Sequence, residues 1–516
     1  MNLSPRSQKW WIVGAMASPV LLICIDFYGI IVALPTIGDA FGADSELLEW
    51  TINGFFLGFA APLVAVGRLA DIVGRRRIVL LGSLLFALAS AFCGFAEDAA
   101  ALIGGRALQG IASALMFSAS LSIVSNAFTK EERGHGIGVW SAIGLLGSAI
   151  GPVVGGLLTE DLSWRWFFYV NLPVAAAGIA LTLLVVPESR DESAPRAIDL
   201  PGFVLVTAAF VGIVLGLQLS SRLGFGSPVV LGSLAVGALL LALFVVVEER
   251  TANPLVQFTL FRGHDYLGGS AVGFIANYAF ASLTFFVTLY LQDILRASPD
   301  RTGAVFMTFS VPLVATSLLV GWAQRLWGVR LPMAVGMVLV AASFLFITGV
   351  TPSEGVDLVV AALVISGFGQ ALAYNISTNA AMSAIPEEKA GAASGVLSSL
   401  RMLGLVMGVA VTGALFNGLE QAKLEQDMTA AGVNFSAMDK VEIRGLLSGT
   451  HDAKERLSAL APDLANRMEA IVGDAFVHAL TISMVVSCLV TMAGVAACFL
   501  VRAPAPKRGQ HTDITV

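Results

Sequence analysis

The chain has 516 residues, of which 56% are hydrophobic and only 13% are charged, and its mean hydropathy is +0.82. This composition excludes a soluble globular domain and predicts an all-α polytopic protein that spans the lipid bilayer. The formal net charge of -6, without a basic patch, argues against nucleic acid as a partner. No nucleotide-binding or cofactor fingerprint occurs in the sequence. We therefore expect neither an enzyme nor a protein with a bound cofactor or metal.

Apolar stretches long enough to cross roughly 30 Å of hydrocarbon recur along the whole chain and predict 14 transmembrane helices. Because this number is even, both termini lie on one side of the membrane, and the excess of Lys and Arg in the loops of that side identifies it as the cytoplasm. We expect a multi-pass protein of the cytoplasmic (inner or plasma) membrane of a bacterium. The predicted spans begin near Trp10, Trp50, Ile78, Ala99, His135, Trp166, Leu200, Pro228, Tyr266, Thr302, Leu331, Leu358, Gly391 and Phe476.

A compact charged loop, residues 67–77, joins the second and third predicted spans. Gly67 and Gly74 allow close helix approach and a tight turn. Arg75 and Arg76 are explained by topology alone, because arginines after a span favour the cytoplasmic side, and a solvated loop is one interpretation. Topology does not require an acid, so we expect Asp71 to pair with a cation or to cap a helix amino terminus across the interface between two halves.

The loop at residues 321–330 repeats this spacing after the tenth predicted span. Its two glycines are separated as Gly67 and Gly74 are, and Arg330 follows the first of them as Arg76 follows Gly67. The repeat divides the predicted helices into six, two and six, as expected for related halves that bind substrate between them. The predicted units are residues 1–187, a linker with two extra helices at 188–265, residues 266–501 with a polar insert at 417–475, and a cytoplasmic tail at 502–516.

Four motifs resemble a known family. The loop 67–77 resembles motif A of the major facilitator superfamily, residues 106–110 resemble motif B, and residues 147–156 resemble motif C, the signature of its antiporters. Residues 163–173 are similar to the entry of the sixth helix in the fourteen-helix drug/proton antiporters of the EmrB/QacA type. The resemblance implies two pseudo-symmetric six-helix bundles, two additional helices, a cytoplasmic latch at motif A, and export driven by the proton gradient without a cofactor.

Asp26 is the acidic residue that we identify in the interior of a predicted span. A carboxylate within the membrane usually faces a cavity or a partner and marks a proton or ion path. At 1.5 Å per residue, Asp26 lies about 13 Å inward from the outer end of its helix, and Arg106 lies about 10 Å inward in the fourth. We expect a pair that forms and breaks with protonation. The alternatives are a static ion pair that holds two helices in register, and a position of Asp26 in the outer headgroup layer.

Gly147, Gly151 and Gly155 recur every fourth residue on one helix face, where another helix can pack backbone to backbone. Pro152 removes a backbone hydrogen bond and is expected to bend this helix. The resemblance implies that the element biases transport toward export. Ordinary packing of small residues is the alternative.

Polar residues in otherwise apolar spans are candidates for the substrate cavity, although such residues also join helices to one another. Arg401 lies deep in the thirteenth span, and its charge must be met by carbonyl groups, water, Asp26 or an anionic substrate group. Apolar walls with a few polar anchors suit amphiphilic substrates, and the lack of membrane acids in the second half favours neutral, zwitterionic or acidic ones. The remaining candidates are Asn53, Asn277, Tyr278, Tyr290, Gln370, Tyr374, Asn375 and Asn379.

The polar segment 417–475 lies outside in this topology, and its helix-like spacing predicts a helical hairpin that is interrupted at Pro462. It could act as a gate, as a docking surface for an envelope partner or as an inert cap.

The leading hypothesis is a proton-coupled antiporter that exports amphiphilic drugs or toxic compounds. A dedicated exporter of a single metabolite or antibiotic would have the same fold. An importer is disfavoured by the motif C glycines. A transporter-like receptor or scaffold that acts through the outer segment is the alternative from another class of function.

Overall fold

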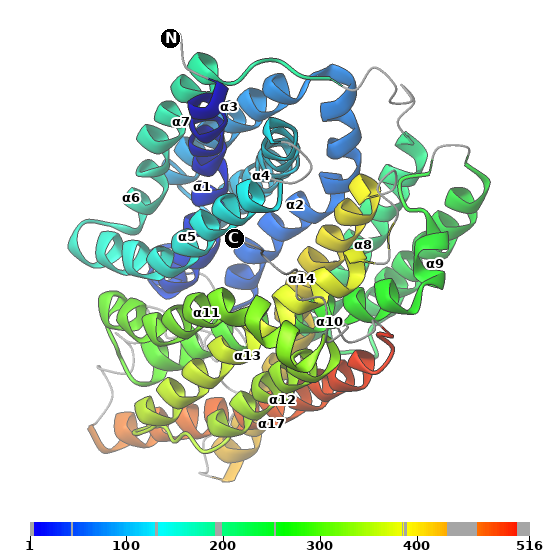
Figure 1. Cartoon of the computed structure of the whole chain (residues 1–516). Coiled ribbons are helices and arrows are strands. Elements are labelled where there is room, and N and C mark those ends of the chain that lie inside the picture. The colour runs from blue at the N-terminus through cyan, green and yellow to red at the C-terminus, as the bar shows by residue number, and fades with distance from the viewer. Residues whose placement is uncertain are drawn as a thin grey trace.

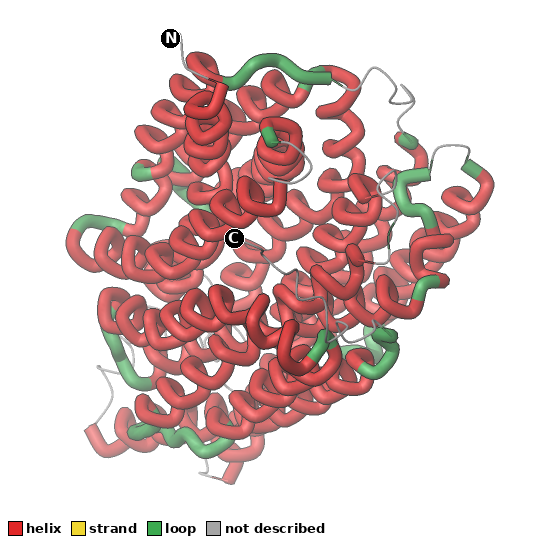
Figure 2. The backbone as a smooth tube through the Cα atoms, in the orientation of Figure 1, coloured by secondary structure: helices red, strands yellow, loops and turns green. Residues whose placement is uncertain are grey.

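The computed structural model describes residues 5–42, 45–128, 133–190, 199–251, 254–383, 385, 390–430 and 462–502, and their regular structure is helical (Figure 2). Within these residues, 12 helices are long and apolar enough to cross a membrane by length and composition. Two further helices, α2 (Ser45–Val73) and α5 (Arg133–Asp161), have 29 residues each and occupy the second and fifth predicted positions. The predicted all-α fold class is confirmed, and the helices follow the predicted spans in order.

The first half of the chain forms one group of helices, in which the sixth predicted span is divided in two at Val170. Ser163 caps the short first piece by accepting a hydrogen bond from the Arg165 backbone N–H at 3.4 Å, which satisfies an otherwise unpaired donor at the helix start. Besides α2 and α5, the helices of this half are α1 (Pro5–Phe41), α3 (Arg75–Gly94), α4 (Ala99–Ala127), α6 (Trp164–Tyr169) and α7 (Asn171–Val185).

The second half forms another group, and the α8–α9 hairpin lies between the two in sequence. The hairpin consists of α8 (Leu200–Leu223) and α9 (Pro228–Arg250), followed by the 3₁₀ turn η1 (Phe258–Arg262). The remaining helices are α10 (His264–Leu289), which a π-helical turn η2 (Tyr290–Ile294) extends, α11 (Pro299–Trp327), α12 (Arg330–Ile347), α13 (Val356–Ser383), α14 (Ala390–Ala430) and α17 (Pro462–Cys498).

The flanks of the predicted polar insert continue membrane helices. α14 extends to Ala430, and Pro462 begins α17 instead of interrupting a helix, because proline is well tolerated in the first helical turn. Residues 431–461 of the insert and 503–516 of the tail lie outside the described residues.

The two halves meet along a seam, in which α2 packs against α14, α5 packs against α11, and α1 contacts α10 and α11. Figure 1 shows α1–α7 together in one half, α10–α17 in the other, and the α8–α9 hairpin beside α14. α8 contacts α14 of one half and α2 of the other. Buried apolar side chains of both halves form one continuous cluster across the seam.

The two halves make equivalent contacts at the repeated loop. Gly74 (φ 124°) and Gly328 (φ 74°) both adopt the positive φ that favours glycine. Arg76 donates to the Leu183 carbonyl at the end of α7, and Arg330 donates to the Val501 carbonyl just after α17. In each half, this arginine therefore ties the repeated loop to the last helix, which supports the interpretation of an internal repeat.

Candidate functional site

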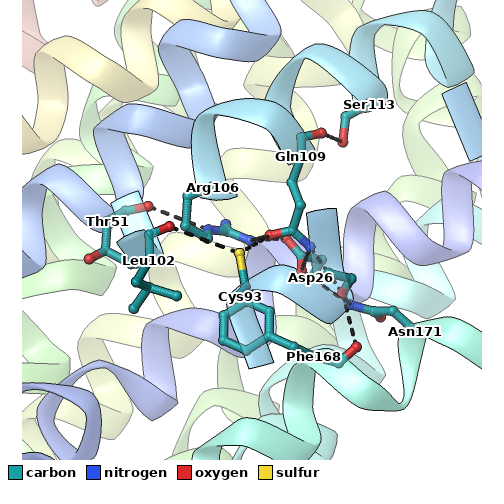
Figure 3. Close-up of polar contacts among 10 residues, drawn as sticks. Asp26, Thr51, Cys93, Leu102, Arg106, Gln109, Ser113, Phe168 and Asn171 are labelled. Carbon is teal, nitrogen blue, oxygen red and sulfur yellow. Dashed lines mark hydrogen bonds and ion pairs between the residues drawn. The ribbon is translucent and has the colours of Figure 1, made fainter. Parts of the chain in front are cut away.

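A fully buried ion pair lies inside the first half. Arg106 Nη1 on α4 donates to Asp26 Oδ2 on α1 at 2.5 Å, and the two side chains are 1% and 0% exposed. Figure 3 shows both side chains pointing toward one another between the helices. The structure thus brings together the two residues whose similar depth in their helices predicted a pair, and it buries Asp26 in the interior of the half.

Polar side chains from three helices complete the pair. Gln109 Nε2 and Asn171 Nδ2 each donate to Asp26 Oδ1 at 3.3 Å, and both also donate to Ser90 Oγ, at 3.1 and 2.9 Å. Gln109 Oε1 in turn accepts from Arg106 Nη1 at 2.8 Å. Because amide groups both donate and accept, this network can serve either a charged or a protonated Asp26.

Arg106 has further partners on α2. Its Nε donates to the Thr51 carbonyl at 3.4 Å, and its guanidinium carbon lies 4.4 Å from the centre of the Phe55 ring. A buried charge is tolerated when it is paired and its remaining donors are satisfied. The site accordingly connects α1, α2, α3, α4 and α7. A change of charge at Asp26 would therefore alter contacts of most helices in this half.

The opposite face of α1 borders the second half. Phe27 and Tyr28 lie beside Phe280 of α10, with ring centres 6.1 and 5.2 Å apart. A small pocket opens at this point of the seam, lined by Tyr28, Ile31, Pro152, Phe280, Thr284, Phe306, Phe309 and Ser310. Its walls are aromatic and apolar with three hydroxyl groups, and its lining contains no charged side chain. Asp26 and the pocket thus lie on two different faces of α1.

The motif C glycines place α5 directly against α1. A Cβ atom at Gly147, Gly151 or Gly155 would lie 3.1, 3.0 and 2.3 Å from backbone carbonyl oxygens of α1. The last of these oxygens belongs to Gly29, where a Cβ atom would in turn lie 2.7 Å from the Gly151 carbonyl oxygen of α5. The expected backbone-to-backbone packing is therefore present, while its role in the direction of transport stays a prediction.

The same helix also contacts the second half. A Cβ atom at Gly156 would lie 2.6 Å from the Pro299 carbonyl oxygen of α11, and one at Gly303 would lie 2.5 Å from the Pro152 carbonyl oxygen. Glycines on both sides therefore allow the backbones of α5 and α11 to touch near the end of α5 and the start of α11.

The motif A loop binds the segment that follows α7. Glu188 Oε1 accepts a hydrogen bond from the Arg76 backbone N–H at 3.1 Å, and Glu188 Oε2 lies 3.6 Å from Arg77 Nε. A Cβ atom at Gly74 would lie 2.6 Å from Glu188 Oε1. The Arg75 backbone N–H donates to the Ser189 carbonyl at 3.0 Å. The Asp71 side chain lies outside the described residues, so its predicted pairing stays a prediction. A Cβ atom at Gly67 would lie 3.1 Å from Ser118 Oγ of α4.

Several predicted cavity residues make contacts within the second half. The Tyr278 hydroxyl lies 3.1 Å from Thr412 Oγ1, and the Tyr290 hydroxyl donates to the Thr351 and Glu354 carbonyls of the loop between α12 and α13. The Asn277 amide bonds to the Gly273 carbonyl of its own helix. Two others join α13 to α11, because Asn375 donates to Ser317 Oγ at 3.1 Å and Asn379 donates to Gln324 Oε1 at 3.1 Å.

Arg401 of α14 is bound mainly by α13. Its Nη2 donates to Ser377 Oγ, Thr378 Oγ1 and the Tyr374 carbonyl at 2.8 to 3.0 Å. Its guanidinium carbon lies 4.1 Å from the centre of the Tyr374 ring. Within the described residues, its charge is met by a carbonyl, two hydroxyls and an aromatic ring, and its partners include no carboxylate.

Two predicted cavity residues are buried with unused polar atoms. Both amide atoms of Asn53 and the Oε1 atom of Gln370 have no hydrogen-bond partner within the described part of the chain. Asn53 follows Glu49 by one turn of α2, and Glu49 Oε1 accepts from Asn417 Nδ2 of α14 at 3.1 Å. Asn53 therefore lies near the seam, and its predicted place in a substrate cavity stays a prediction.

Sequence reasoning missed four polar residues of these sites. Gln109 and Asn171 belong to quoted motifs but received no role, and Glu188 was treated as part of a charged linker. Ser90 has no distinguishing pattern in an apolar span. A signal existed for Gln109, which lies three residues after Arg106 and so faces the same side of its helix.

The comparisons with known proteins agree with this architecture. Residues 19–409 match the model of the Major Facilitator Superfamily. The chain belongs to this family. This facilitator is 35% identical over 413 residues to the multidrug resistance protein Stp of Mycobacterium tuberculosis, covering 80% of this chain and 76% of that protein. It is 31% identical over 410 residues to the tetracenomycin C resistance and export protein of Streptomyces glaucescens, covering 80% and 76%.

A solved structure shares the facilitator fold. A bacterial homologue of the human lysosomal transporter Spinster, in an inward-facing and unoccupied conformation, aligns with a TM-score of 0.65 at 15% identity, covering 96% of this chain and 98% of that one. The family resemblance drawn from motifs A, B and C is confirmed. This facilitator is a multi-pass membrane transporter whose similar relatives include bacterial resistance proteins.

Proposed function

We propose that this facilitator is a proton-coupled antiporter that exports amphiphilic drugs or toxic compounds across the bacterial plasma membrane, with both termini in the cytoplasm. The names of its relatives, a multidrug resistance protein and an antibiotic export protein, support export. The observation that carries proton coupling is the fully buried Asp26–Arg106 pair. Neither a cofactor nor a metal is needed for this function, because protonation of Asp26 is the energy-coupling event.

The coupling follows from the two faces of α1. Protonation of Asp26 removes the charge that holds Arg106, and the Gln109 and Asn171 amides can then rearrange around a neutral carboxyl group. The adjacent Tyr28 lines the seam pocket. A shift of α1 on protonation therefore changes the contact between the halves, and rocking of the halves around this seam exposes the bound compound to either side.

The pocket points to the substrate class. Aromatic walls with a few hydroxyl groups suit promiscuous binding of amphiphilic molecules. We propose that neutral and aromatic amphiphiles are accepted best, with Asn53 as an additional anchor. An envelope partner at residues 417–475 finds no support in the relatives, and the proposed export does not require one.

The test uses everted membrane vesicles energised with a pH gradient. Collapse of the gradient is recorded after addition of cationic, neutral and anionic amphiphiles, for the wild type, Asp26→Asn and the control Glu160→Gln, which removes an exposed acid of the same half. We expect substrate-dependent collapse in the wild type and the control and its loss in Asp26→Asn. Collapse that persists in Asp26→Asn at equal expression would contradict the proposed coupling.

A dedicated exporter is the second candidate, because one relative is named for a single antibiotic. The same panel separates the two functions: a dedicated exporter responds to one chemical class, whereas a multidrug exporter responds to several.

A further inference from the structure

The base of the α8–α9 hairpin contains two buried carboxyl groups that the proposed transport mechanism does not use. Asp199 caps the amino terminus of α8, where its Oδ1 accepts from the Gly202 backbone N–H at 2.9 Å. Glu248 lies in the last turn of α9, where its Oε2 accepts from the Val256 backbone N–H at 3.0 Å. The two residues are 6% and 2% exposed.

The second oxygen of each carboxyl group is directed toward the other group. A Cβ atom at Gly202 would lie 2.6 Å from Asp199 Oδ2 and 2.5 Å from Glu248 Oε1, so both oxygens lie beside the same backbone atom. Both oxygens therefore face the same space beside Gly202. Within the described residues, neither oxygen has a hydrogen-bond donor, because ionised carboxylates only accept. A hydrogen bond between the two groups supplies the missing donor, and it requires a proton on one of them.

No cation compensates this pair within the described residues. Among the described residues, no Lys, Arg or His nitrogen lies within 4.0 Å of either carboxyl group. The nearby charged residues of the adjoining segments are Glu249 and Arg250 at the end of α9 and Arg262 in η1, and all three are exposed. Two like charges in one buried site do not both ionise readily. We place the proton on Glu248, because Asp199 already serves as the amino-terminal cap of α8.

We propose that Asp199 and Glu248 form a second proton-binding site, separate from Asp26, which holds one proton between Oδ2 and Oε1. The bound proton joins the start of α8 to the end of α9 and to the segment at Val256 that leads toward α10. Because α8 contacts both α2 and α14, the site fixes a hairpin that touches both halves. Loss of the proton at alkaline pH leaves two buried anions and loosens this attachment.

The experiment measures the thermal unfolding midpoint of the full-length protein in detergent as the pH rises from neutral to alkaline. We expect the wild-type midpoint to fall with rising pH. Glu248→Gln should keep the neutral-pH midpoint and lose most of this fall, because its amide N–H donates to Asp199 without titrating. The control Glu249→Gln should behave like the wild type. Asp26→Asn should retain the alkaline fall, which keeps this test distinct from that of the transport mechanism.

Three results would overturn the proposal. One is an alkaline fall in Glu248→Gln equal to that of the wild type. Another is a neutral-pH midpoint in Glu248→Gln as low as in Glu248→Ala. The third is a response to metal cations. If Na⁺ or Mg²⁺ raised the alkaline-pH midpoint of the wild type but not that of Glu248→Gln, the site would bind a metal cation and not a proton. Infrared spectroscopy gives a second measure, because the protonated carboxyl band at neutral pH should be weaker in Glu248→Gln.

Discussion

Arg106 is the residue at which a charge role and a packing role can be separated. Its Nη1 donates hydrogen bonds to both Asp26 and Gln109, and its Nε donates to the Thr51 carbonyl. Removing one partner of a buried ion pair costs about 3–5 kcal/mol. We expect Arg106→Ala to abolish efflux and to lower the amount of folded protein. Arg106→Lys should retain partial efflux, because it keeps the charge but loses the planar fork of donors.

The measurement is drug efflux from cells, normalised to protein in the membrane. The control Arg301→Ala removes an exposed arginine and should leave efflux unchanged. Equal efflux in the wild type, Arg106→Lys and Arg106→Ala would remove Arg106 from the mechanism.

Some residues of the site could be predicted from the sequence and others could not. Asp26 and Arg106 were identified because a charge in an apolar span is rare and its depth follows from the helical rise. Asn171 and Glu188 were not, because their roles depend on contacts with residues far away in the chain. Arg401 is a third case. The sequence predicted a buried charge without an acidic partner, but it could not predict the hydroxyl and aromatic partners, because they depend on the packing of α13.

Among the helices, α5 is the element whose pattern was most informative, because its glycine spacing predicted a face that packs against another backbone. The identity of the partner helix did not follow from that spacing, and neither did the second contact, with α11. The division of the sixth predicted span at Val170 was also not predicted, because the apolar character continues across the break.

Gly156→Ala tests the contact between α5 and α11. The added Cβ atom would lie 2.6 Å from the Pro299 carbonyl oxygen, and backbone atoms cannot yield as a flexible side chain can. We expect the outer ends of the halves to separate, which would increase labelling of Ser310→Cys by a membrane-impermeant thiol reagent applied from outside. The Ser310 hydroxyl faces the Ser148 carbonyl across the seam.

The matched control is Gly104→Ala, because a Cβ atom there would meet nothing within 4 Å. It should leave the labelling of Ser310→Cys unchanged. Unchanged labelling in Gly156→Ala as well would mean that this contact does not govern closure.

At the scale of the whole molecule, contacts between the halves close the end of the seam that the predicted topology places outside. Gln292 Nε2 donates to the Val32 carbonyl at 2.8 Å, and Asn417 Nδ2 donates to Glu49 Oε1 at 3.1 Å. Asn417→Ala removes a hydrogen bond to a buried carboxylate, which is worth about 1.5–3 kcal/mol. We therefore expect the equilibrium to shift toward an outward-open state by roughly one order of magnitude or more.

Spin labels at the exposed positions Ala40 and Gln426 would report this shift as a population at longer distance. Thr429→Ala serves as the control, because the Thr429 hydroxyl bonds only within its own helix. An unchanged distance distribution in Asn417→Ala would show that this bond does not hold the halves together.

The α8–α9 hairpin covers one of the two edges of the seam, so a compound dissolved in lipid meets two different edges. α8 stands beside the edge at which α2 meets α14. α5 and α11 themselves expose large apolar side chains, including Leu146, Leu318 and Leu319. The hairpin therefore covers the α2–α14 edge, whereas no additional helix pair stands beside the α5–α11 edge within the described residues. If the halves separate, we expect a lipophilic molecule to enter from the bilayer at the α5–α11 edge only.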